Sequence, residues 1–449
     1  MTSTPVASWP APQAPYPITA VVTVPGSKSE TNRALVLAAL ADGPSRITGG
    51  LVARDSELMI AALRQLGVSI EIGEQEWLVS PPQQFTGGVE IDCGLAGTVM
   101  RFVAALAVLA DGPVKLTGDL QAFSRPMRPL LEGLRQLGAS VDGDALPCTV
   151  AGAVLASDEP VVIDSSSSSQ YVSALLLVGA RLPDGLELRH EGPTLPSLPH
   201  IAMTVEMLRD RGVRIEDDPE HGRWVVHPGP IAARDVHVEP DLSNAAPFLA
   251  AAAVTMGTVT VTDWPLSTTQ PGDKLRHLFS QFGCETRLDA DGFTVTGYDS
   301  PDGIEVDLSD ASELTPVVAA VAALAKHTSH IHGVAHIRGH ETDRLAALEA
   351  ELAGLGARVH QTEDGLVIHP ALLRGNTFHA YADHRMAQAG ALLGLVVDDV
   401  TVDDIGCTSK TMPEFPALWE QMIADTITNV ETEAEAISTV EESSEGSDS

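Results

Sequence analysis

The segment ALRQLGVSIEI, residues 62–72, carries the pattern that decides the fold. It reads as the end of an amphipathic helix, a glycine at the helix C-terminus, and then an alternating strand. Four more segments repeat it: GLRQLGASVDG from residue 133, MLRDRGVRIED from 207, LFSQFGCETRL from 278 and ELAGLGARVHQ from 351. Their glycines keep a spacing of roughly 70 residues, which indicates one supersecondary unit used repeatedly. These glycines are Gly67, Gly138, Gly212, Gly283 and Gly356.

A second, more apolar helix lies ahead of each of these segments, as in RFVAALAVLADGPVKLTGD from residue 101. Counting these helices gives six copies, the last of which ends after Trp419. Each copy holds two helices and about four strands, so the sequence predicts an α/β fold in which six units form two similar domains. The Ala-rich helices are apolar nearly all round, which predicts that they are buried.

The domain boundaries follow from the repeat and from the composition of the two ends. We expect a flexible leader over residues 1–16 and a domain of repeats 1–3 over residues 26–240. We expect a domain of repeats 4–6 over residues 17–25 and 241–424, so that the early strand ITAVVTV pairs with the second half. The last 25 residues contain eight carboxylates and no Lys or Arg, which predicts a disordered acidic tail over residues 425–449.

Composition excludes several classes of partner. The net charge is −34, with 61 Asp and Glu against 27 Lys and Arg, so we expect no binding to nucleic acid or to an anionic membrane. The chain has no apolar run of the ~18 residues that a membrane helix needs. Its four cysteines lie far apart, without zinc-site spacing, which suits a reducing cytoplasm. Its N-terminus lacks the pattern of a secretory signal.

Cations stand where helices begin. The stretch PGSKSETNRALVLAAL, residues 25–40, resembles a phosphate loop but lacks its glycine spacing. A helix N-terminus carries partial positive charge, so Lys or Arg in the first turn is unfavourable unless an anion binds there. Seven cations occupy or adjoin such starts: Lys28, Arg33, Arg101, Arg125, Arg344, Arg385 and Lys410. They predict a cleft between the two domains for a ligand with several negative charges. Glu313 and Glu341 share this polar rim, where a carboxylate is expected to move protons.

The sequence resembles the 5-enolpyruvylshikimate-3-phosphate synthase family, the 3-phosphoshikimate 1-carboxyvinyltransferases of aromatic amino-acid biosynthesis. The resemblance covers residues 18–419. It rests on PGSKSETNRALVLAAL, LAGTVMRF, SRPMRPL, SSSQ, ETDRL, DHRMA and CTSKTMPEF, in this order. It implies two domains of three βαβαββ units each. It also implies transfer of the enolpyruvyl group of phosphoenolpyruvate to the 5-hydroxyl of shikimate 3-phosphate, through a tetrahedral intermediate, at a site where glyphosate occupies the space of phosphoenolpyruvate in this family.

The resemblance also implies roles for individual residues. Lys28, Ser29 and Arg33 would hold shikimate 3-phosphate, Ser168, Ser169 and Ser197 would take its phosphate, and Gln170 would lie between the two substrates. Arg125 and Lys410 would bind the phosphate of phosphoenolpyruvate, Arg344 and Arg385 its carboxylate, and Gly97 would press against it. Glu313 would act as the base on the 5-hydroxyl. Glu341, near Lys28 and His384, would be the candidate for protonating the methylene carbon.

No cofactor or metal is required by this chemistry, and we expect a monomer. The chain departs from the family pattern at four positions. Leu95 stands where the family has Asn, Glu313 where it has Asp, His340 where it has Lys, and His200 where it often has Tyr. His340 would still contact substrate phosphate.

Three other interpretations fit parts of the sequence. The related UDP-N-acetylglucosamine enolpyruvyl transferases carry a Lys-Asn pair and a reactive cysteine loop, whereas this chain has Lys28-Ser29 and no such loop. A non-enzymatic, repeat-built module that binds anions or nucleic acid is disfavoured by the net charge. The histidine-rich run at residues 327–340 suggests a metal site, but no carboxylate or cysteine completes it in sequence, so we expect a surface strand there.

Overall fold

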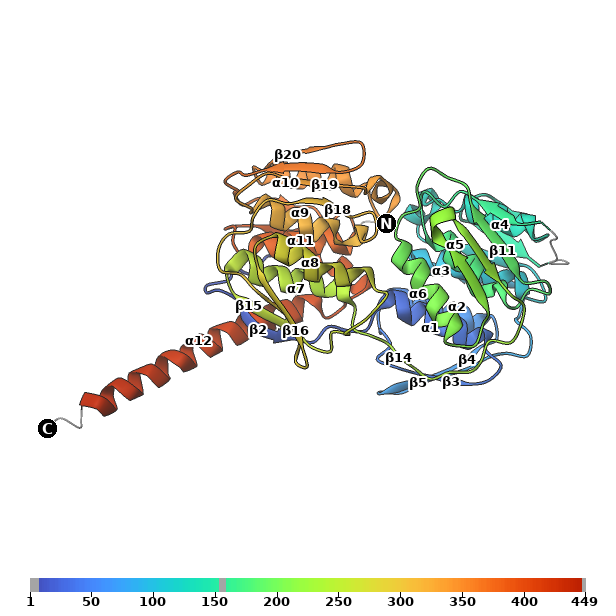
Figure 1. Cartoon of the computed structure of the whole chain (residues 1–449), viewed down its shortest axis with the longest axis horizontal. Helices are drawn as coiled ribbons and strands as arrows, with labels where there is room; N and C mark the ends of the chain where they lie inside the picture. The colour runs from blue at the N-terminus through green and yellow to red at the C-terminus, as the bar shows by residue number, and fades with distance from the viewer. Residues whose placement is uncertain (1–7, 153–158, 446–449) are drawn as a thin grey trace.

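The computed structural model describes residues 8–152 and 159–445, with side chains described up to residue 432. Two bodies lie side by side, and a long C-terminal helix extends away from one of them (Figure 1). The first half of the chain builds one body and the second half builds the other. The N-terminal segment from residue 8 to residue 22, at the blue end of the colour bar, lies with the body of the second half. The chain is therefore an α/β protein of two similar domains, as the repeat predicted.

One sheet topology recurs through the chain. In the second repeat β6 (Val89–Asp92) lies parallel to β7 (Val114–Thr117), and β9 (Cys148–Ala151) and β8 (Ser140–Asp142) follow in antiparallel order. The helix α3 (Gly97–Leu106) links the parallel pair. Parallel strands need such a crossover, whereas a short turn is enough to join β8 to β9.

Two further sheets have the same order within a single repeat. Their elements are β10 (Val161–Ile163), β11 (Leu186–His190), β12 (Ile215–Asp218) and β13 (Arg223–Val226), and then β18 (Glu305–Asp307), β19 (Ser329–His332), β20 (Arg358–Gln361) and β21 (Leu366–His369). The helices of these three repeats are α4 (Arg128–Gln136), α5 (Gln170–Gly179), α6 (Leu198–Arg209), α9 (Thr315–Ala323) and α10 (Arg344–Gly354).

The first and fourth repeats exchange their first strands. β2 (Thr19–Val22) precedes the helices of repeat 1 but lies parallel to β15 of repeat 4, and β14 (Val236–His237) precedes repeat 4 but lies parallel to β3 of repeat 1. The remaining elements of these repeats are α1 (Lys28–Leu40), β3 (Ser45–Thr48), α2 (Arg54–Gln65), β4 (Ser69–Ile72), β5 (Glu76–Ser80), α7 (Leu242–Thr255), β15 (Thr258–Val261), α8 (Leu275–Gln281), β16 (Glu285–Asp289) and β17 (Gly292–Thr296).

The sixth repeat is shortened. β22 (Thr377–Phe378) lies parallel to β23 (Thr401–Val402), with α11 (His384–Gly394) between them. The chain then enters α12 (Phe415–Glu445) in place of a second strand pair.

The five repeat glycines end helices as the sequence predicted. Their φ angles lie between 78° and 98°, in the left-handed region where other residues are strained. Each therefore turns the chain from a helix into the next strand.

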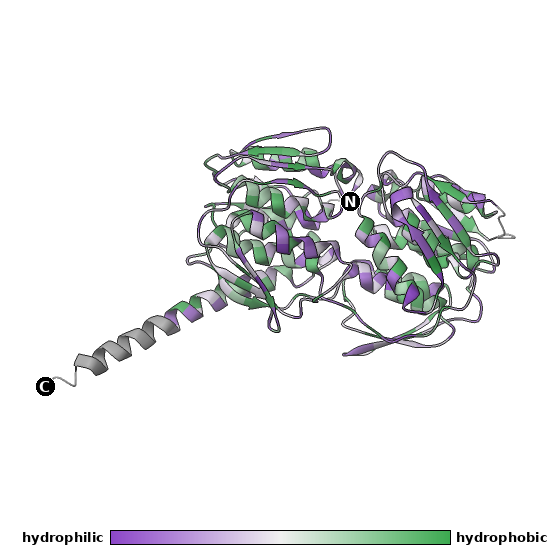
Figure 2. Ribbon diagram, in the orientation of Figure 1, coloured by the Kyte–Doolittle hydropathy of each residue, from purple (hydrophilic) through white to green (hydrophobic). Residues whose placement is uncertain are grey.

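Each body has its own hydrophobic core. One buried cluster draws on residues 34–238, and the other on residues 11–24 and 242–423. Every residue of α3 and of α9 is buried, and Figure 2 shows hydrophobic residues gathered on the central helices of both bodies. From these clusters and the strand exchange we propose that the first domain spans residues 26–240 and that the second combines residues 17–25 with 241–424, extended at both ends by the chain segments around Ala11 and Ile427 that pack against its core.

Two chain segments cross between the bodies side by side. The Ser27 N–H donates to the carbonyl of Glu239 at 2.7 Å, and the Asp241 N–H donates to the carbonyl of Pro25 at 2.8 Å. The Glu30 carboxylate accepts from the Glu239 N–H at 2.9 Å. Burial raises the pKa of Glu30 to about 7. An acidic group is thus enclosed where the bodies are connected.

This carboxylate predicts a pH dependence of stability. Between about pH 4.5 and 7 the unfolded chain loses the Glu30 proton whereas the folded chain keeps it, so the free energy of unfolding falls as the pH rises. Glu30→Gln should therefore raise the free energy of unfolding at pH 8 by about 1–3 kcal/mol, and the Tm with it. Near pH 4 it should leave both unchanged. Thermal melts at both pH values test this, with exposed Glu71→Gln as the control. An equal change at both pH values would contradict it.

The expectation of a flexible leader is wrong for residues 8–16. β1 (Trp9–Pro10) pairs antiparallel with β23, and the Ala11 N–H donates to the Val400 carbonyl at 3.0 Å. Ala14 packs against the second core. The Pro-rich composition concealed this because its partner strand lies almost 400 residues away. Residues 1–7 lie outside the described part of the chain.

The expectation of disorder after residue 424 is wrong as far as Glu445, because α12 continues through it. The segment has no Gly or Pro before Gly446 to end the helix. The Thr426 side chain is fully buried, donates to the Thr19 carbonyl at 3.2 Å and accepts from the Thr19 N–H at 3.0 Å. Ile427 packs against the second core.

These contacts predict two different effects of truncation. A chain that ends at Ile423 loses the Thr426 bonds to β2, each worth about 1 kcal/mol, and should melt about 2–6 °C lower. A chain that ends at Thr432 keeps these contacts and should melt within about a degree of the full chain. Scanning calorimetry on both truncations distinguishes the outcomes. Equal Tm values would show that α12 adds nothing beyond Ile423.

Candidate active site

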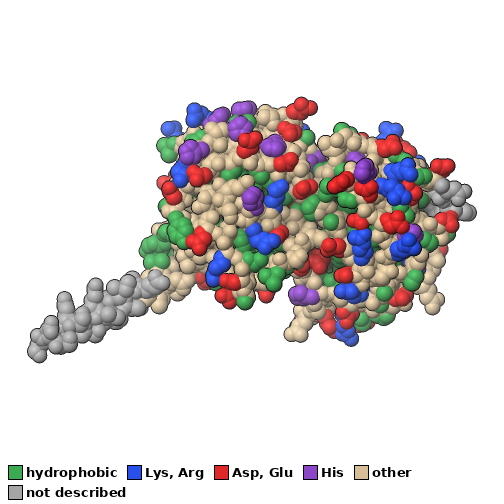
Figure 3. All heavy atoms as spheres, viewed as in Figure 1, with side chains coloured by type: hydrophobic (Ala, Val, Ile, Leu, Met, Phe, Trp, Pro, Cys, Tyr) green, Lys and Arg blue, Asp and Glu red, His purple; other side chains and the backbone are tan. Residues whose placement is uncertain are grey.

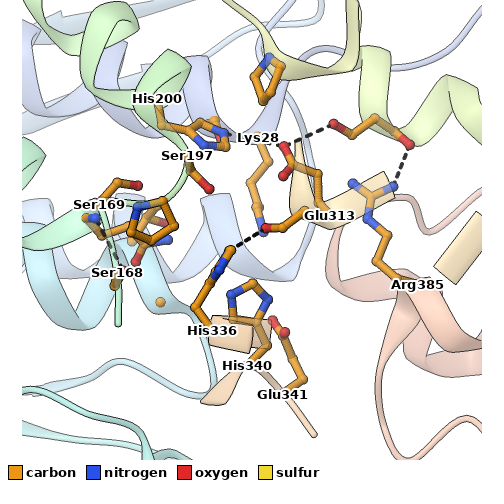
Figure 4. Close-up of a pocket in the computed structure, with 18 of the residues that line it drawn as sticks. Lys28, Ser168, Ser169, Ser197, His200, Glu313, His336, His340, Glu341 and Arg385 are labelled. Atoms are coloured by element: carbon orange, nitrogen blue, oxygen red, sulfur yellow. Dashed lines mark hydrogen bonds and ion pairs between the residues drawn. The ribbon is translucent and has the colours of Figure 1, made fainter. Parts of the chain in front are cut away.

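A cleft between the two bodies gathers the polar helix starts that the sequence singled out (Figure 4). The sequence-predicted residues that line it are Lys28, Ser29, Arg33, Gly97, Arg125, Ser168, Ser169, Gln170, Ser197, Glu313, His340, Glu341, Arg344, His384 and Arg385. Lys410 is the exception. It lies behind Glu341 and lines an adjoining groove with Arg54, Asp119 and Cys407. On the face of the molecule drawn in Figure 3, acidic and basic side chains are interspersed.

Lys28 is the first residue of α1, and buried carboxylates contact both its side-chain amine and its backbone N–H. Its Nζ lies 3.4 Å from Oδ2 of Asp55, and its backbone N–H donates to Asp241 at 3.2 Å. Burial lowers the pKa of Lys28, Asp55 raises it in part, and Lys410 lowers it further. Lys28 is therefore a cation that gives up its proton more easily than an exposed lysine does.

Arg33 is the residue for which the structure adds most to the sequence prediction. It is 1% exposed, and each of its three guanidinium nitrogens donates to protein. Nε bonds Thr204 at 2.7 Å, Nη1 bonds the Ser29 carbonyl at 2.9 Å, and Nη2 bonds the His200 carbonyl at 2.9 Å. Arg33 thus holds α1 against α6, and it contributes positive charge to the cleft through this fixed position.

The start of α3 is crowded by polar side chains. Gly97 does not have a positive φ, so a left-handed turn is not the reason for a glycine here. A Cβ at this position would lie 3.0 Å from Oε1 of Gln170, 3.1 Å from Nη2 of Arg125 and 3.2 Å from Nη1 of Arg101. Arg101 in turn donates to Gln170 at 2.6 Å. Close approach is therefore what requires glycine at residue 97.

The serines of the same wall also sit at helix starts. Ser168 and Ser169 precede α5, and Oγ of Ser168 accepts from the Gln170 N–H at 3.2 Å. Ser197 precedes α6 with φ of 55°, and its N–H donates to the Ser309 carbonyl at 2.9 Å. Because Ser309 belongs to the opposite body, this bond bridges the cleft.

Glu313 faces the cleft from the other body, in the short helical turn Ser312–Leu314. Its Oε1 accepts from Oγ of Ser243 at 3.5 Å and lies 3.8 Å from Nε2 of His200. Burial raises the pKa of Glu313, and nearby Arg385 offsets this only in part. A partly buried carboxylate with a raised pKa is suited to accept a proton.

Glu341 has the opposite electrostatic setting. Its two oxygens are bonded by Nζ of Lys410 and, at 3.2 Å, by Nη2 of Arg344. Burial opposes ionisation, but Lys410, Arg125 and Arg344 together hold the pKa of Glu341 well below its usual range. Glu341 is therefore an ionised group that organises the cations, which weighs against its suggested role as a proton donor.

Arg344 and Arg385 are arranged by one buried carboxylate, Asp383. Nε and Nη2 of Arg344 bond its two oxygens at 2.8 and 3.0 Å, and the Arg385 N–H donates to Oδ1 at 2.9 Å. The Arg385 guanidinium reaches the cleft, where Nη1 donates to the Ser243 carbonyl at 2.6 Å. Asp383 was missed in the sequence, where DHRMA drew attention only to the residues that follow it.

Four imidazoles lie in or beside these cations. Burial lowers the pKa of His200 to about 3 and of His336 to about 4, and holds those of His340 and His384 well below the usual range. Neighbouring arginines and lysines add to this effect, so all four rings are neutral near pH 7. His336 donates to or accepts from Oγ of Ser312 at 2.8 Å and was not predicted as a site residue. The histidine run 327–340 was its signal.

The described residues contain no cluster of three or more His, Cys, Asp or Glu side chains that could hold a metal ion. No helix in the described part of the chain is long and apolar enough to cross a membrane. The cleft offers an excess of positive charge at several helix N-termini, together with one carboxylate that can take up a proton. That combination suits a polyanionic substrate and proton transfer.

Comparison with known proteins agrees with this chemistry. The family model for EPSP synthase (3-phosphoshikimate 1-carboxyvinyltransferase) matches residues 12–419. Two solved structures of EPSP synthase from Acinetobacter baumannii have a similar fold, each with a TM-score of 0.75. They are 23% and 22% identical to this chain; each alignment covers 92% of it, and 97% and 98% of the two solved chains.

Proposed function

The chain belongs to the EPSP synthase family, and we propose that its interdomain cleft is the active site for the family's reaction. As a 3-phosphoshikimate 1-carboxyvinyltransferase, it transfers the enolpyruvyl group of phosphoenolpyruvate to the 5-hydroxyl of shikimate 3-phosphate and releases phosphate. The observation that carries the assignment to this cleft is the cage of cations around one carboxylate whose pKa is raised.

Substrate binding divides between the two walls. Ser168, Ser169 and Ser197 bind the phosphate of shikimate 3-phosphate, and Lys28, Ser29 and Gln170 orient its ring. On the other side, Arg344 and Arg385 bind the carboxylate of phosphoenolpyruvate. The phosphate of phosphoenolpyruvate lies against Arg125 beside Gly97, and His340 lines the same end of the site. Lys410 acts indirectly, through its ion pair with Glu341.

The proton transfers follow from the electrostatics of the cleft. Glu313 removes the proton of the 5-hydroxyl while the oxygen of that hydroxyl attacks C2 of phosphoenolpyruvate. A proton adds to the methylene carbon in the same step. Lys28 is the donor that its lowered pKa favours, whereas Glu341 and neutral His384 organise the cations around it. The neutral Lys28 amine then takes a proton back from the methyl group as phosphate leaves, which re-forms the carbon–carbon double bond, now in the enol ether of the product. The cation cage stabilises the charge that develops on the departing phosphate.

Phosphate release from phosphoenolpyruvate tests the function directly. We expect release that depends on shikimate 3-phosphate, without any added metal or cofactor. Release that depends instead on UDP-N-acetylglucosamine would overturn the assignment. We further propose that the enzyme acts as a monomer in the cytoplasm, because one chain supplies both walls of the cleft and the four cysteines are free thiols. Light scattering of the purified chain tests the oligomeric state.

Gly97→Ala tests close approach at the start of α3. The added methyl presses on Arg125 and Gln170, and a misfit of this size commonly costs ~1–3 kcal/mol. We expect the KM for phosphoenolpyruvate to rise roughly 5- to 100-fold, because 1.36 kcal/mol is tenfold. The KM for shikimate 3-phosphate should rise by a smaller factor, because the methyl also meets Gln170, and the Tm should fall only slightly, because the side chains that it meets line the open cleft. A markedly lowered Tm with both KM values raised alike would show that Gly97 serves the fold instead.

A further inference from the structure

The turn that leads into α11 contains unusual backbone geometry. Tyr381 and Ala382 both have left-handed conformations, with φ of 56° and 55°, although neither is glycine. Two such residues in succession are strained and persist only where their surroundings impose this conformation. The next residue is Asp383, whose carboxylate orients Arg344 and Arg385. The strain therefore lies directly beside the anion-binding arginines.

One helix holds both ends of this turn. Arg344, at the start of α10, bonds both oxygens of Asp383. Two helical turns later Glu351, only 6% exposed, accepts from the Tyr381 hydroxyl at 2.6 Å and from the His379 N–H at 2.8 Å. Both carboxylate oxygens of Glu351 are thus used on the turn.

The phenol is a dependable donor in this contact. Its hydrogen bond to Glu351 raises the pKa of Tyr381 to about 12, so the hydroxyl keeps its proton throughout the neutral range. Asp403 supports the same turn from the other side, where it accepts from the Ala380 N–H at 2.8 Å and contacts the His379 ring at 2.7 Å. Asp403 therefore contacts residues 379 and 380, whereas the Tyr381 hydroxyl donates to Glu351.

We propose that Glu351 and Tyr381 are positioning residues, which hold the strained turn at residues 379–383 so that Asp383 orients Arg344 and Arg385 for the substrate carboxylate. This proposal rests on the proposed function, since it takes these two arginines as the ligands of phosphoenolpyruvate. Neither residue touches substrate. Their effect travels through the backbone of the turn and through the Asp383 carboxylate.

Tyr381→Phe in the full chain removes only the hydroxyl. Without it we expect the turn to relax, the KM for phosphoenolpyruvate to rise at least fivefold, and the KM for shikimate 3-phosphate to stay within twofold of wild type. The chain offers a matched control in Tyr298, whose hydroxyl bonds Glu285 at 2.7 Å on the exposed surface of the same body. Tyr298→Phe should change neither KM.

Ala382→Gly provides the rescue. Glycine adopts the left-handed conformation without the cost of a Cβ, so the turn needs less restraint. Added to Tyr381→Phe, it should return the KM for phosphoenolpyruvate to within about twofold of wild type. A merely structural role for the hydroxyl would lower the Tm and shift both KM values together, and Ala382→Gly would not separate them.

Amide hydrogen exchange gives a readout that does not depend on turnover. Tyr381→Phe should speed exchange at residues 379–387 at least tenfold and leave the rest of α11 unchanged, whereas Tyr298→Phe should have no effect there. Wild-type exchange at these residues in Tyr381→Phe, or an unchanged KM for phosphoenolpyruvate in an active enzyme, would overturn the positioning role. A wild-type chain without phosphate release would overturn the proposed function alone.

Discussion

Glu313→Gln is expected to lower kcat by ~10²-fold or more while the protein folds normally. The change is nearly isosteric, and the amide oxygen can still accept from Oγ of Ser243. What it removes is the property that the mechanism requires of this residue, a carboxylate whose raised pKa lets it take the 5-hydroxyl proton. Steady-state kinetics beside thermal melts measure both effects.

A pH profile sharpens this test. In the wild-type enzyme kcat should fall as the pH drops through the raised pKa of Glu313, because the protonated group cannot act as a base. That acidic limb should disappear from the residual activity of the variant. Exposed Glu305→Gln, eight residues earlier on β18, is the matched control and should behave as wild type. Near-normal turnover by purified Glu313→Gln would remove the residue from the mechanism.

Arg344→Ala is expected to have the largest combined effect on binding and stability. It leaves fully buried Asp383 without its bidentate partner and takes one bond from Glu341. Breaking a buried ion pair by removing one partner commonly costs 3–5 kcal/mol. We therefore expect a Tm about 10 °C lower and a KM for phosphoenolpyruvate raised at least 30-fold. Calorimetry and kinetics at saturating shikimate 3-phosphate measure these effects.

Two further variants separate binding from stability. Arg385 bonds a carbonyl and Gln388 rather than a buried carboxylate, so Arg385→Ala should raise the same KM with a much smaller loss of Tm. The double variant Arg344→Ala, Asp383→Ala removes the unpaired charge and should regain part of the lost stability but none of the lost affinity. Equal effects of Arg344→Ala on both substrates would mean that Arg344 serves the fold rather than the carboxylate.

The repeat was visible in the sequence because each unit ends its helix with a glycine that must adopt a left-handed conformation. Gly67 and its four counterparts therefore mark the phase of every helix and strand. The cations at helix starts were visible for a similar reason, because Lys28 or Arg385 in a first turn is unfavourable without an anion. Local rules of this kind act over a few residues and can be recognised without the structure.

The parts that escaped prediction depend on distant contacts. Trp9 pairs with Val402, and Thr426 bonds Thr19, so neither end of the chain shows locally why it is ordered. The pairing of Glu341 with Lys410, 69 residues away, which sets the charge of Glu341, also cannot be seen in the local sequence. Asp383 and Glu351 likewise gain their meaning from α10 and the turn before α11 lying together. The order, charge and role of these residues depend on which distant residues they contact, and one sequence alone does not show those contacts.

The exchange of β2 and β14 between the bodies has a consequence for folding during synthesis. Residues 26–240 contain every strand of the first body and can fold as soon as they leave the ribosome. β2 is made earlier still but must wait for β15, because Thr19 pairs with Thr258. At 5–20 residues per second, the roughly 240 residues between them take about 10–50 s to add. The order of translation thus sets the order of assembly. In a circular permutant that begins near residue 26 and places β2 after α12, β15 would already have been made when β2 emerges, so β2 could pair at once.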